Sequence, residues 1–295
     1  MLQSPTRRSL LLSVASATIT SACTSWPDDT HAFAATQNQL SSLEAATGGR
    51  LGVAAWNLAN GVMVSHRADE RFPFCSTFKL LAVSAILKRS EAERDLLQRR
   101  IVYTQKDVVK YSPITGEHTG HGMTVADLCA AALQHSDNTA ANLLIRMLGG
   151  PAAVTRFARS IGDDRFRLDR WETALNSALP GDLHDTTTPA AMMRDLKRLA
   201  LGNLLGAPER EKIVGWMRHC TTGAKRVRAG VPAGWSVANK SGTGDYGTTN
   251  DIAVIWPPAK PAIVLAVYFT QHEKEAPPHD DIVASATRIV IEAFR

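Results

Sequence analysis

The segments with strand patterning lie near the two ends of this chain, and a long region with helical patterning separates them. Near the N-terminus, residues 50–69 read as two strands that turn at Asn60-Gly61, a preferred two-residue hairpin turn. Near the C-terminus, three segments have strand composition, residues 235–244, 248–258 and 262–271. An isolated hairpin is only marginally stable in water, so the two ends must combine. The sequence therefore predicts an α+β fold with a five-stranded antiparallel sheet that joins both ends of the chain.

Helical patterning flanks this sheet and fills the region between its two parts. Residues 38–48 and 279–295 have apolar residues at helical spacing, and we expect these N- and C-terminal helices to flank the sheet. From Ser76 to about Met217, nearly every segment reads as helix or loop. The predicted domains are an α/β domain of residues 35–66 plus 219–295 and an inserted all-helical domain of residues 67–218. We expect the active site in the cleft between them.

The first 34 residues have the layout of an export signal. Arg7 and Arg8 precede an apolar stretch at residues 10–19, and small residues follow. The stretch is shorter than the roughly 20 apolar residues that a membrane-spanning helix needs. Cleavage is expected before Ala35, with Cys23 as a competing lipid attachment site, and the arginine pair resembles a twin-arginine signal. The predicted location is therefore the periplasm, with or without a lipid anchor.

The net charge of +5 arises outside this signal, because Arg7 and Arg8 offset Asp28 and Asp29 within it. Lysine and arginine are scattered along the chain, and the densest cluster, residues 225–228, is short. Nucleic-acid binding usually requires basic residues gathered on one element with aromatic residues between them. We therefore predict no nucleic-acid partner.

Three cysteines remain beyond the predicted signal, namely Cys75, Cys129 and Cys220. No metal-binding spacing joins them, so we interpret them as small buried apolar residues. Cys75 lies beside a serine and is a weaker candidate nucleophile, since no histidine partner is apparent. The sequence predicts neither a metal nor a cofactor.

A serine and a lysine, Ser76 and Lys79, lie three residues apart near the start of the apolar segment 73–88. In a helix such residues share one face, about 5–6 Å apart at Cβ, so the Lys79 amine can reach the Ser76 hydroxyl. A buried cation is costly unless it has a partner or a task, and a desolvated lysine of lowered pKa can act as a base. The pair indicates an activated serine, and the alternative is that Ser76 only caps the helix.

Two other short motifs follow in the chain. Ser136-Asp137-Asn138 lies between two segments with helical patterning, where these residues would also serve as a helix cap. Lys240-Ser241-Gly242 lies in a predicted strand, where its small residues would let a ligand lie along the backbone. The alternative there is an edge-strand lysine that prevents aggregation. Each motif alone is a weak signal.

In this order, the three motifs form the signature of the serine penicillin-recognising enzymes. From about Ala35 to Arg295 the chain resembles a class A β-lactamase through the segments FCSTFK, YSPIT, HSDNTAANLL, LDRWETALNSA, GDLHDTTTP and KSGTGDYGTTNDIAVIWPP. The fold of this family, a helical domain against an α/β domain that contains both termini, agrees with the predicted arrangement. Glu172 and Asn176 match the family's Glu-x-x-x-Asn pattern on the Ω-loop, here about residues 167–185.

The resemblance implies hydrolysis of the β-lactam ring of penicillins and cephalosporins, and with it resistance to these antibiotics. Ser76 would attack the carbonyl carbon, activated by Lys79, by Glu172 through a water, or by both. Ser136 would relay a proton to the leaving ring nitrogen. Glu172, oriented by Asn176, would activate the water that releases the acyl group.

The resemblance also implies binding and structural roles. The backbone N–H groups of Ser76 and Thr243 would form the oxyanion hole. The residues implied in substrate binding are Tyr111, Asn138, Lys240, Ser241, Gly242, Thr243 and Arg226. Arg170 and Asp185 would tie the ends of the Ω-loop together. The implied partners are small-molecule β-lactam substrates and β-lactam-type inhibitors, and the implied state is a monomer.

The chain departs from the family pattern at several positions. Ser241 stands where threonine is commoner and keeps the hydroxyl, while Asn239 stands where aspartate is frequent and removes a negative charge near Lys240. Cys75 is expected to face Gly244 rather than a second cysteine, so the disulfide typical of the family's carbapenemases is missing. This difference argues against strong carbapenem hydrolysis.

Three other functions stay open on the residues alone. A D,D-peptidase or another penicillin-binding protein would share the acylated serine but would not depend on Glu172. A noncatalytic β-lactam sensor would stay acylated. A zinc hydrolase is suggested only by His118 and His121, and no further ligand cluster completes such a site.

Overall fold

The computed structural model describes Met1 and residues 29–295, with side chains from Ala34 onward. The predicted apolar signal stretch, the twin-arginine pair and Cys23 lie outside these residues. The first helix, α1 (Asp29–Thr47), begins before the predicted cleavage site at Ala35. Within the described part of the chain, no helix is long and apolar enough to cross a membrane.

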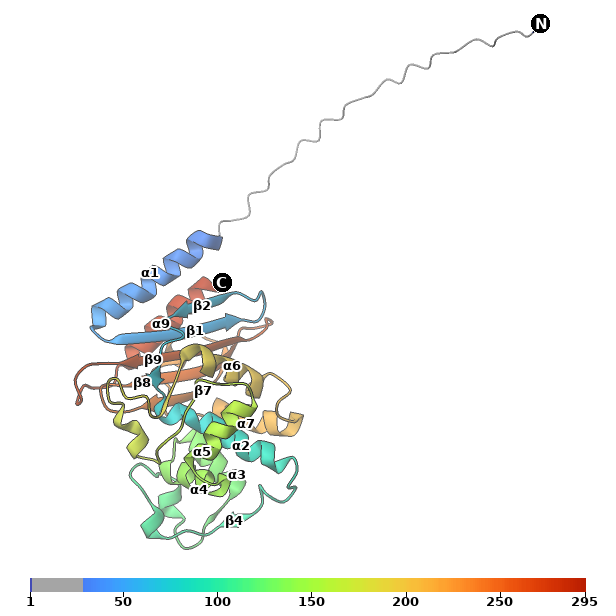
Figure 1. Cartoon of the computed structure of the whole chain (residues 1–295), viewed down its shortest axis with the longest axis vertical. Coiled ribbons are helices and arrows are strands. Elements are labelled where there is room, and N and C mark those ends of the chain that lie inside the picture. Colours follow the sequence, from blue (N-terminus) through green and yellow to red (C-terminus); the bar gives the residue numbers. More distant parts are fainter. Residues whose placement is uncertain (2–28) are drawn as a thin grey trace.

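A five-stranded antiparallel sheet combines the two ends of the chain, as predicted (Figure 1). Its strands are β1 (Arg50–Asn57), β2 (Met63–His66), β7 (Ser236–Thr243), β8 (Thr249–Trp256) and β9 (Ile263–Thr270). The strand order is β2-β1-β9-β8-β7, so the N-terminal hairpin joins the C-terminal strands through the pairing of β1 with β9. Gly61 closes the hairpin turn with φ +78°, a left-handed conformation that glycine adopts without strain.

One face of the sheet is covered by α1 and α9 (Asp280–Ala293), the two terminal helices (Figure 1). These helices and the sheet share an apolar core, which includes Leu51, Val53, Leu265, Val267, Val283 and Val290. α9 begins with Asp280 and Asp281 in its first turn, where carboxylates stabilise the positive end of the helix dipole. The flanking positions of both helices are thus confirmed.

The other face of the sheet packs on the helical region. The helices of this region are α2 (Lys79–Ser90), α3 (Val125–Gln134), α4 (Asn138–Leu148), α5 (Pro151–Ser160), α6 (Pro189–Ala200) and α7 (Ala207–Arg218). A short α8 (Val227–Gly230) follows before the sheet resumes. α6 packs directly on β1, β8 and β9, and one large apolar core extends from Tyr268 on the sheet to Met192 and Leu196 on α6.

Two small ladders depart from the expectation of an all-helical insert. β3 (Phe72–Pro73) pairs with β6 (Thr186–Thr187), and β4 (Arg100–Ile101) pairs with β5 (Met123–Thr124). Short 3-10 turns are also present: η1 (Cys75–Phe78), η2 (Gln105–Asp107), η3 (Thr115–Glu117) and η4 (Ala174–Ser177). Strands of two residues carry no alternation, so the sequence gives no signal for them. The domain boundaries at residues 67 and 219 stay predictions.

The secondary structure around the motifs shows which of their residues serve as helix caps. Asp137 is the N-cap of α4, and its side chain accepts a hydrogen bond from the Ala140 N–H at 2.8 Å. Gly149 ends the same helix in the left-handed region. Ser76, in contrast, lies inside η1 and caps neither η1 nor α2, so the alternative that it serves only as a helix cap is wrong.

Candidate active site

A cleft of about 840 Å³ lies between the edge strand β7 and the helical region. Its lining includes Ser76, Tyr111, Ser136, Asn138, Asn176 and Ser241. Tyr111 is more than half exposed at the mouth of the cleft, while Ser76 is only 8% exposed at its base. The structure therefore brings together residues from all three motifs and from the Ω-loop.

The Lys79 amine lies at the centre of the site and is fully buried. Its Nζ atom lies 3.0 Å from Ser76 Oγ and 3.0 Å from Glu172 Oε1. It also donates to the Ser136 carbonyl oxygen at 2.7 Å and to Asn138 Oδ1 at 2.6 Å. Burial lowers the pKa of Lys79, and the Glu172 carboxylate opposes that shift.

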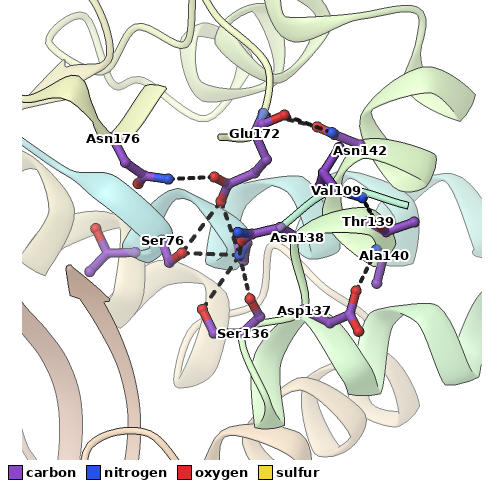
Figure 2. A network of polar contacts seen from close by, with 12 residues as sticks. Ser76, Val109, Ser136, Asp137, Asn138, Thr139, Ala140, Asn142, Glu172 and Asn176 are labelled. Atoms are coloured by element: carbon purple, nitrogen blue, oxygen red, sulfur yellow. Dashed lines mark hydrogen bonds and ion pairs between the residues drawn. The ribbon is translucent and has the colours of Figure 1, made fainter. Parts of the chain in front are cut away.

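Glu172 is held at three points above Ser76 (Figure 2). Asn176 Nδ2 donates to Glu172 Oε2 at 2.6 Å, which fixes one carboxylate oxygen. The Asn142 side chain bonds both the N–H and the C=O of Glu172, at 3.0 and 2.9 Å. The other carboxylate oxygen is then directed at Ser76 Oγ, 3.4 Å away. The four-residue spacing of the Glu-x-x-x-Asn pattern thus places the Asn176 amide against the Glu172 carboxylate.

In the Ser136-Asp137-Asn138 segment, the outer two residues line the cleft and the middle one bonds to the surrounding backbone. Asp137 faces away, where it also accepts hydrogen bonds from the backbone N–H groups of Ile114 and Thr115. Ser136 has φ +57°, and both it and Asn138 line the cleft. The cap alternative is therefore correct for Asp137 alone.

Lys240 reaches Ser136 from the opposite wall. Its Nζ donates to Ser136 Oγ at 3.0 Å and to the Ser241 carbonyl oxygen at 2.7 Å. The side chain is fully buried, so the alternative of an exposed edge lysine is wrong. Burial, assisted by the nearby positive charge of Lys79, lowers the pKa of Lys240 to about 7. Ser136 Oγ thus lies between two amines.

Two glycines let β7 and the residue after it lie close to Ser76 and its neighbour Cys75. A Cβ atom on Gly242 would lie 2.8 Å from the Phe74 carbonyl oxygen and 3.2 Å from the Ser76 nitrogen. A Cβ atom on Gly244 would lie 2.6 Å from both the Asn176 carbonyl oxygen and the Cys75 sulfur. The close approach requires glycine at both positions. Cys75 does face Gly244, and it is a free, buried cysteine.

Arg226 lies behind β7 and is 5% exposed, although its sequence run is typical of a surface. Its guanidinium donates to Thr243 Oγ1 and to the Gly242 carbonyl oxygen, each at 2.7 Å. Asp280 Oδ1 accepts from its Nε at 2.7 Å. Arg226 therefore reaches the cleft through Thr243 and does not line it directly.

Asn239, the departure beside Lys240, points to the other side of β7. Its amide donates to both carboxylate oxygens of Asp251, at 2.9 and 3.1 Å, and its Oδ1 accepts from Arg228. Burial raises the pKa of Asp251 to about 6. An aspartate at position 239 would place two buried carboxyl groups together, and the asparagine avoids that repulsion.

Ion pairs and backbone hydrogen bonds join residues 169–170 to residues 182–185. Arg170 forms an ion pair with Asp185, which is fully buried, and a second one with Asp182 at 3.1 Å. Asp185 Oδ1 also accepts from the backbone N–H groups of Asp169 and Arg170. These contacts fix the loop that carries Glu172.

The other proposed chemistries find less support in the described residues. No group of three His, Cys, Asp or Glu side chains that could hold a metal occurs within residues 34–295. His118 lines a separate cavity of about 370 Å³ beside α3. Burial raises the pKa of the Cys75 thiol above its usual range, which disfavours the thiolate.

Several contacts at the site were missed in the sequence. Asn142 follows Asn138 by four residues on α4, so helical spacing could have placed it on the same face. Thr222 and Asp280 gave no such signal, because each reaches the site from a distant segment. Lys110 lines the cleft, and its carbonyl oxygen accepts from the Asn138 amide at 2.9 Å.

Comparisons with known proteins agree with this arrangement. The sequence model of the beta-lactamase enzyme family matches residues 35–294. Beta-lactamase CTX-M-97 of Escherichia coli is 53% identical over 258 residues, which cover 88% of this chain and 89% of that protein. Beta-lactamase OXY-1 of Klebsiella oxytoca is 52% identical over 260 residues, with the same coverage of 88% and 89%. The crystal structure of a beta-lactamase from Burkholderia phymatum has a TM-score of 0.88 and 55% identity, covering 90% of this chain and 100% of that chain.

Proposed function

Because this chain belongs to the class A β-lactamase family, we propose that it hydrolyses penicillins and cephalosporins through an acyl-enzyme on Ser76. The relatives that are themselves named beta-lactamases support β-lactam hydrolysis and antibiotic resistance. The observation that carries the mechanism is that Ser76 Oγ lies within reach of both the Lys79 amine and the Glu172 carboxylate. A base beside a serine can take its proton and make the serine oxygen a nucleophile. A base can later activate the water that releases the acyl group from the serine.

In the acylation step, the contacts of Lys79 favour Glu172 as the proton acceptor. A lysine ammonium has three hydrogens. Three groups around Lys79 can only accept them: the Ser136 carbonyl, Asn138 Oδ1 and Glu172 Oε1. Lys79 in this arrangement therefore has no lone pair for the Ser76 proton, whereas Glu172 does. Ser76 Oγ then bonds to the β-lactam carbonyl carbon while its proton passes to Glu172.

The charge that develops on the carbonyl oxygen would be bound by the backbone N–H groups of Ser76 and Thr243. The close approach of β7 at Gly242 supports this, since a Cβ atom added there would lie only 3.2 Å from the Ser76 nitrogen. The C–N bond of the ring then breaks, and the nitrogen receives a proton from Ser136. Lys240 at 3.0 Å and Lys79 at 3.4 Å from Ser136 Oγ can replace that proton.

The remaining cleft residues suit the rest of the substrate. Ser241, Thr243 and the cation Lys240 would hold the substrate carboxylate, with Arg226 behind Thr243. The Asn138 amide and the exposed ring of Tyr111 would contact the acylamino side chain at the mouth.

After acylation, Glu172 would pass the Ser76 proton to the Lys79 amine 3.0 Å away, whose own proton has replaced that of Ser136, and would so become a carboxylate again. In the deacylation step, this carboxylate would take a proton from a water that attacks the ester carbon. The ester C–O bond breaks, and Ser76 Oγ recovers a proton from Glu172. Asn176 supports this role because it holds the carboxylate in one orientation at 2.6 Å. General-base catalysis of this kind contributes roughly 10²–10⁴-fold.

We propose in addition that residues 1–34 direct export to the periplasm and that the mature enzyme acts as a monomer. The start of the family match at residue 35 supports a boundary there. The intact mass of protein purified from a periplasmic extract would distinguish cleavage before Ala35 from lipidation at Cys23.

The proposed function is tested by the variant Glu172→Gln. Removing the carboxylate also removes the charge that raises the pKa of Lys79, so the neutral amine becomes available to activate Ser76. The variant should therefore still be acylated, although more slowly. Deacylation should slow by about 10²–10⁴-fold. Intact-protein mass spectrometry should then find the enzyme heavier by one whole penicillin, because ring opening releases no fragment.

A matched control is Glu117→Gln, which changes an exposed glutamate in η3 outside the cleft and should turn over penicillin like the parent. If Glu172→Gln keeps full turnover, Glu172 is not the deacylating base. If the parent enzyme itself accumulates the acyl form without release, the chain is a penicillin-binding protein or sensor and the proposed hydrolysis is wrong.

A further inference from the structure

Thr222, in the loop between α7 and α8, makes a close contact with the β7 motif. Its Oγ1 atom lies 2.6 Å from Ser241 Oγ, and both residues line the cleft. The loop is held in place by the neighbouring Thr221, whose N–H and hydroxyl both donate to the Gln134 carbonyl oxygen at the end of α3. The position of the Thr222 hydroxyl is therefore set by the fold and not by a ligand.

Ser241 depends on such a neighbour because its side chain is unbranched. A threonine has a second substituent on Cβ that restricts χ1, whereas a serine hydroxyl can occupy three staggered positions. The Ser241 carbonyl oxygen is already bonded to Lys240, so its backbone is fixed while its hydroxyl is free to rotate. The Thr222 contact selects one of these rotamers.

The available hydrogens give this contact a direction. Each hydroxyl carries one hydrogen and can accept others. Ser241 can donate to a substrate carboxylate only if its hydrogen is not used on Thr222. Thr222 must then donate to Ser241, and its own lone pairs can accept from the Cys220 thiol, whose sulfur lies 3.5 Å from Thr222 Oγ1. The resulting chain of hydrogen bonds runs from the Cys220 thiol to the Thr222 hydroxyl, and from there to the Ser241 hydroxyl, which can donate into the cleft.

We propose that Thr222 is a positioning residue for the substrate carboxylate, which acts by orienting the Ser241 hydroxyl outward. This inference rests on the proposed function, in which Ser241 binds the carboxylate of a penicillin. The hydrogen bond from Thr222 would restrict the Ser241 hydroxyl to one rotamer, as Cβ branching restricts the hydroxyl of a threonine.

The test is a double-mutant cycle in kcat/KM for benzylpenicillin. Thr222→Val keeps the shape of the side chain and removes its hydroxyl. We expect a loss of roughly tenfold, the size expected when one hydrogen bond to a charged group is weakened. The same change in a Ser241→Ala background should have almost no further effect, because the group that Thr222 orients is gone. Thr222→Ser should retain most of the activity.

Two further arms separate positioning from a structural role. Ser241→Thr should restore much of the activity lost in Thr222→Val, since the branched side chain restricts its own hydroxyl. Benzylpenicillin methyl ester, which lacks the anion, should be hydrolysed equally by the parent and by Thr222→Val. The matched control Thr47→Val removes a hydroxyl that donates to the Glu44 carbonyl oxygen at the end of α1, outside the cleft, and should not change the ratio of acid to ester activity.

A tenfold loss that is the same with and without Ser241, or the same on acid and ester, would overturn the inference. So would an unchanged kcat/KM in Thr222→Val while the parent is active. If the parent does not hydrolyse benzylpenicillin at all, the proposed function fails instead, so the two failures are distinguishable.

Discussion

Replacing Asp195 by asparagine should stabilise the protein, and the gain should grow as the pH rises. Asp195 lies on α6, where it is completely buried and neither carboxylate oxygen contacts a nitrogen or hydroxyl donor. Its neighbour is Asp163, which is 4% exposed and whose Oδ2 also has no such donor. Two carboxyl groups can share a hydrogen bond only when one of them carries a proton. Burial, and then the charge of Asp163, raise the pKa of Asp195 well above its usual range.

The proton belongs on Asp195 because the Asp163 carboxylate already accepts two backbone hydrogen bonds. Asp163 Oδ1 accepts from the backbone N–H groups of Arg165 and Phe166, at 2.6 and 3.1 Å. Asp195 has no such donors, and Arg194 and Arg198 oppose the rise in its pKa only in part. An asparagine in its place would offer Asp163 Oδ2 a permanent donor without needing a proton.

The pH dependence follows from linkage. When a group has a higher pKa in the folded state than in the unfolded state, its stabilising contribution is complete below the unfolded pKa. That contribution is lost as the pH rises towards the folded pKa, with a slope of about 1.4 kcal/mol per pH unit. Between pH 5 and pH 7, the free energy of unfolding of Asp195→Asn should therefore gain up to about 2.7 kcal/mol over the parent.

Urea unfolding of both proteins at pH 5, 6 and 7 measures this difference. The control is Asp164→Asn, which changes an adjacent aspartate whose side chain is 84% exposed and should show no such slope. A stability difference that does not change with pH, or a variant less stable than the parent at pH 7, would refute the shared proton.

Three other perturbations test the cleft. The pKa of Lys240, lowered to about 7, means that its charge is lost above that pH, so kcat/KM for carboxylate-bearing substrates should fall by up to about tenfold per unit in a pH profile. Gly244→Ala places a Cβ 2.6 Å from the Asn176 carbonyl oxygen, so it should cost about 1–3 kcal/mol in urea unfolding and slow deacylation in burst kinetics. Asp280→Asn removes the charge 2.7 Å from Arg226 Nε and should raise KM several-fold with little change in kcat, as measured by steady-state kinetics.

The sheet was predictable because its strands carry strong local signals and because a hairpin cannot stand alone. The three motifs were predictable for a different reason. Each is a weak signal alone, but the three in this order form the signature of the serine penicillin-recognising enzymes. The position of Arg226 was harder to predict from its run of basic residues, which is typical of a surface, yet the side chain is buried behind β7. Asp195 likewise reads as one charge on an amphipathic helix, and only tertiary packing places it against Asp163.

Contacts between distant segments account for most of what the sequence did not indicate. Thr222 and Ser241 are 19 residues apart, and Arg226 and Asp280 are 54 apart. No helical or strand period links residues across such distances, so only the folded chain brings them together. The two-residue ladders were missed for a different reason, since an alternating pattern needs at least four residues to be seen.

In the proposed mechanism, the charges of the cleft give the ring carboxylate of a substrate a role in the chemistry as well as in binding. Of the two buried amines, Lys79 contacts the Glu172 carboxylate at 3.0 Å, whereas Lys240 forms no ion pair with any carboxylate in the described part of the chain. Burial, together with the positive charge of Lys79, lowers the pKa of Lys240 to about 7 in the free enzyme. A bound carboxylate would supply the missing negative charge, raise the pKa of Lys240 and draw a proton onto it. That proton would arrive 3.0 Å from Ser136 Oγ, the group that must protonate the leaving nitrogen in the proposed mechanism. In the proposed mechanism, binding of the substrate anion would thus prepare the acid that completes ring opening.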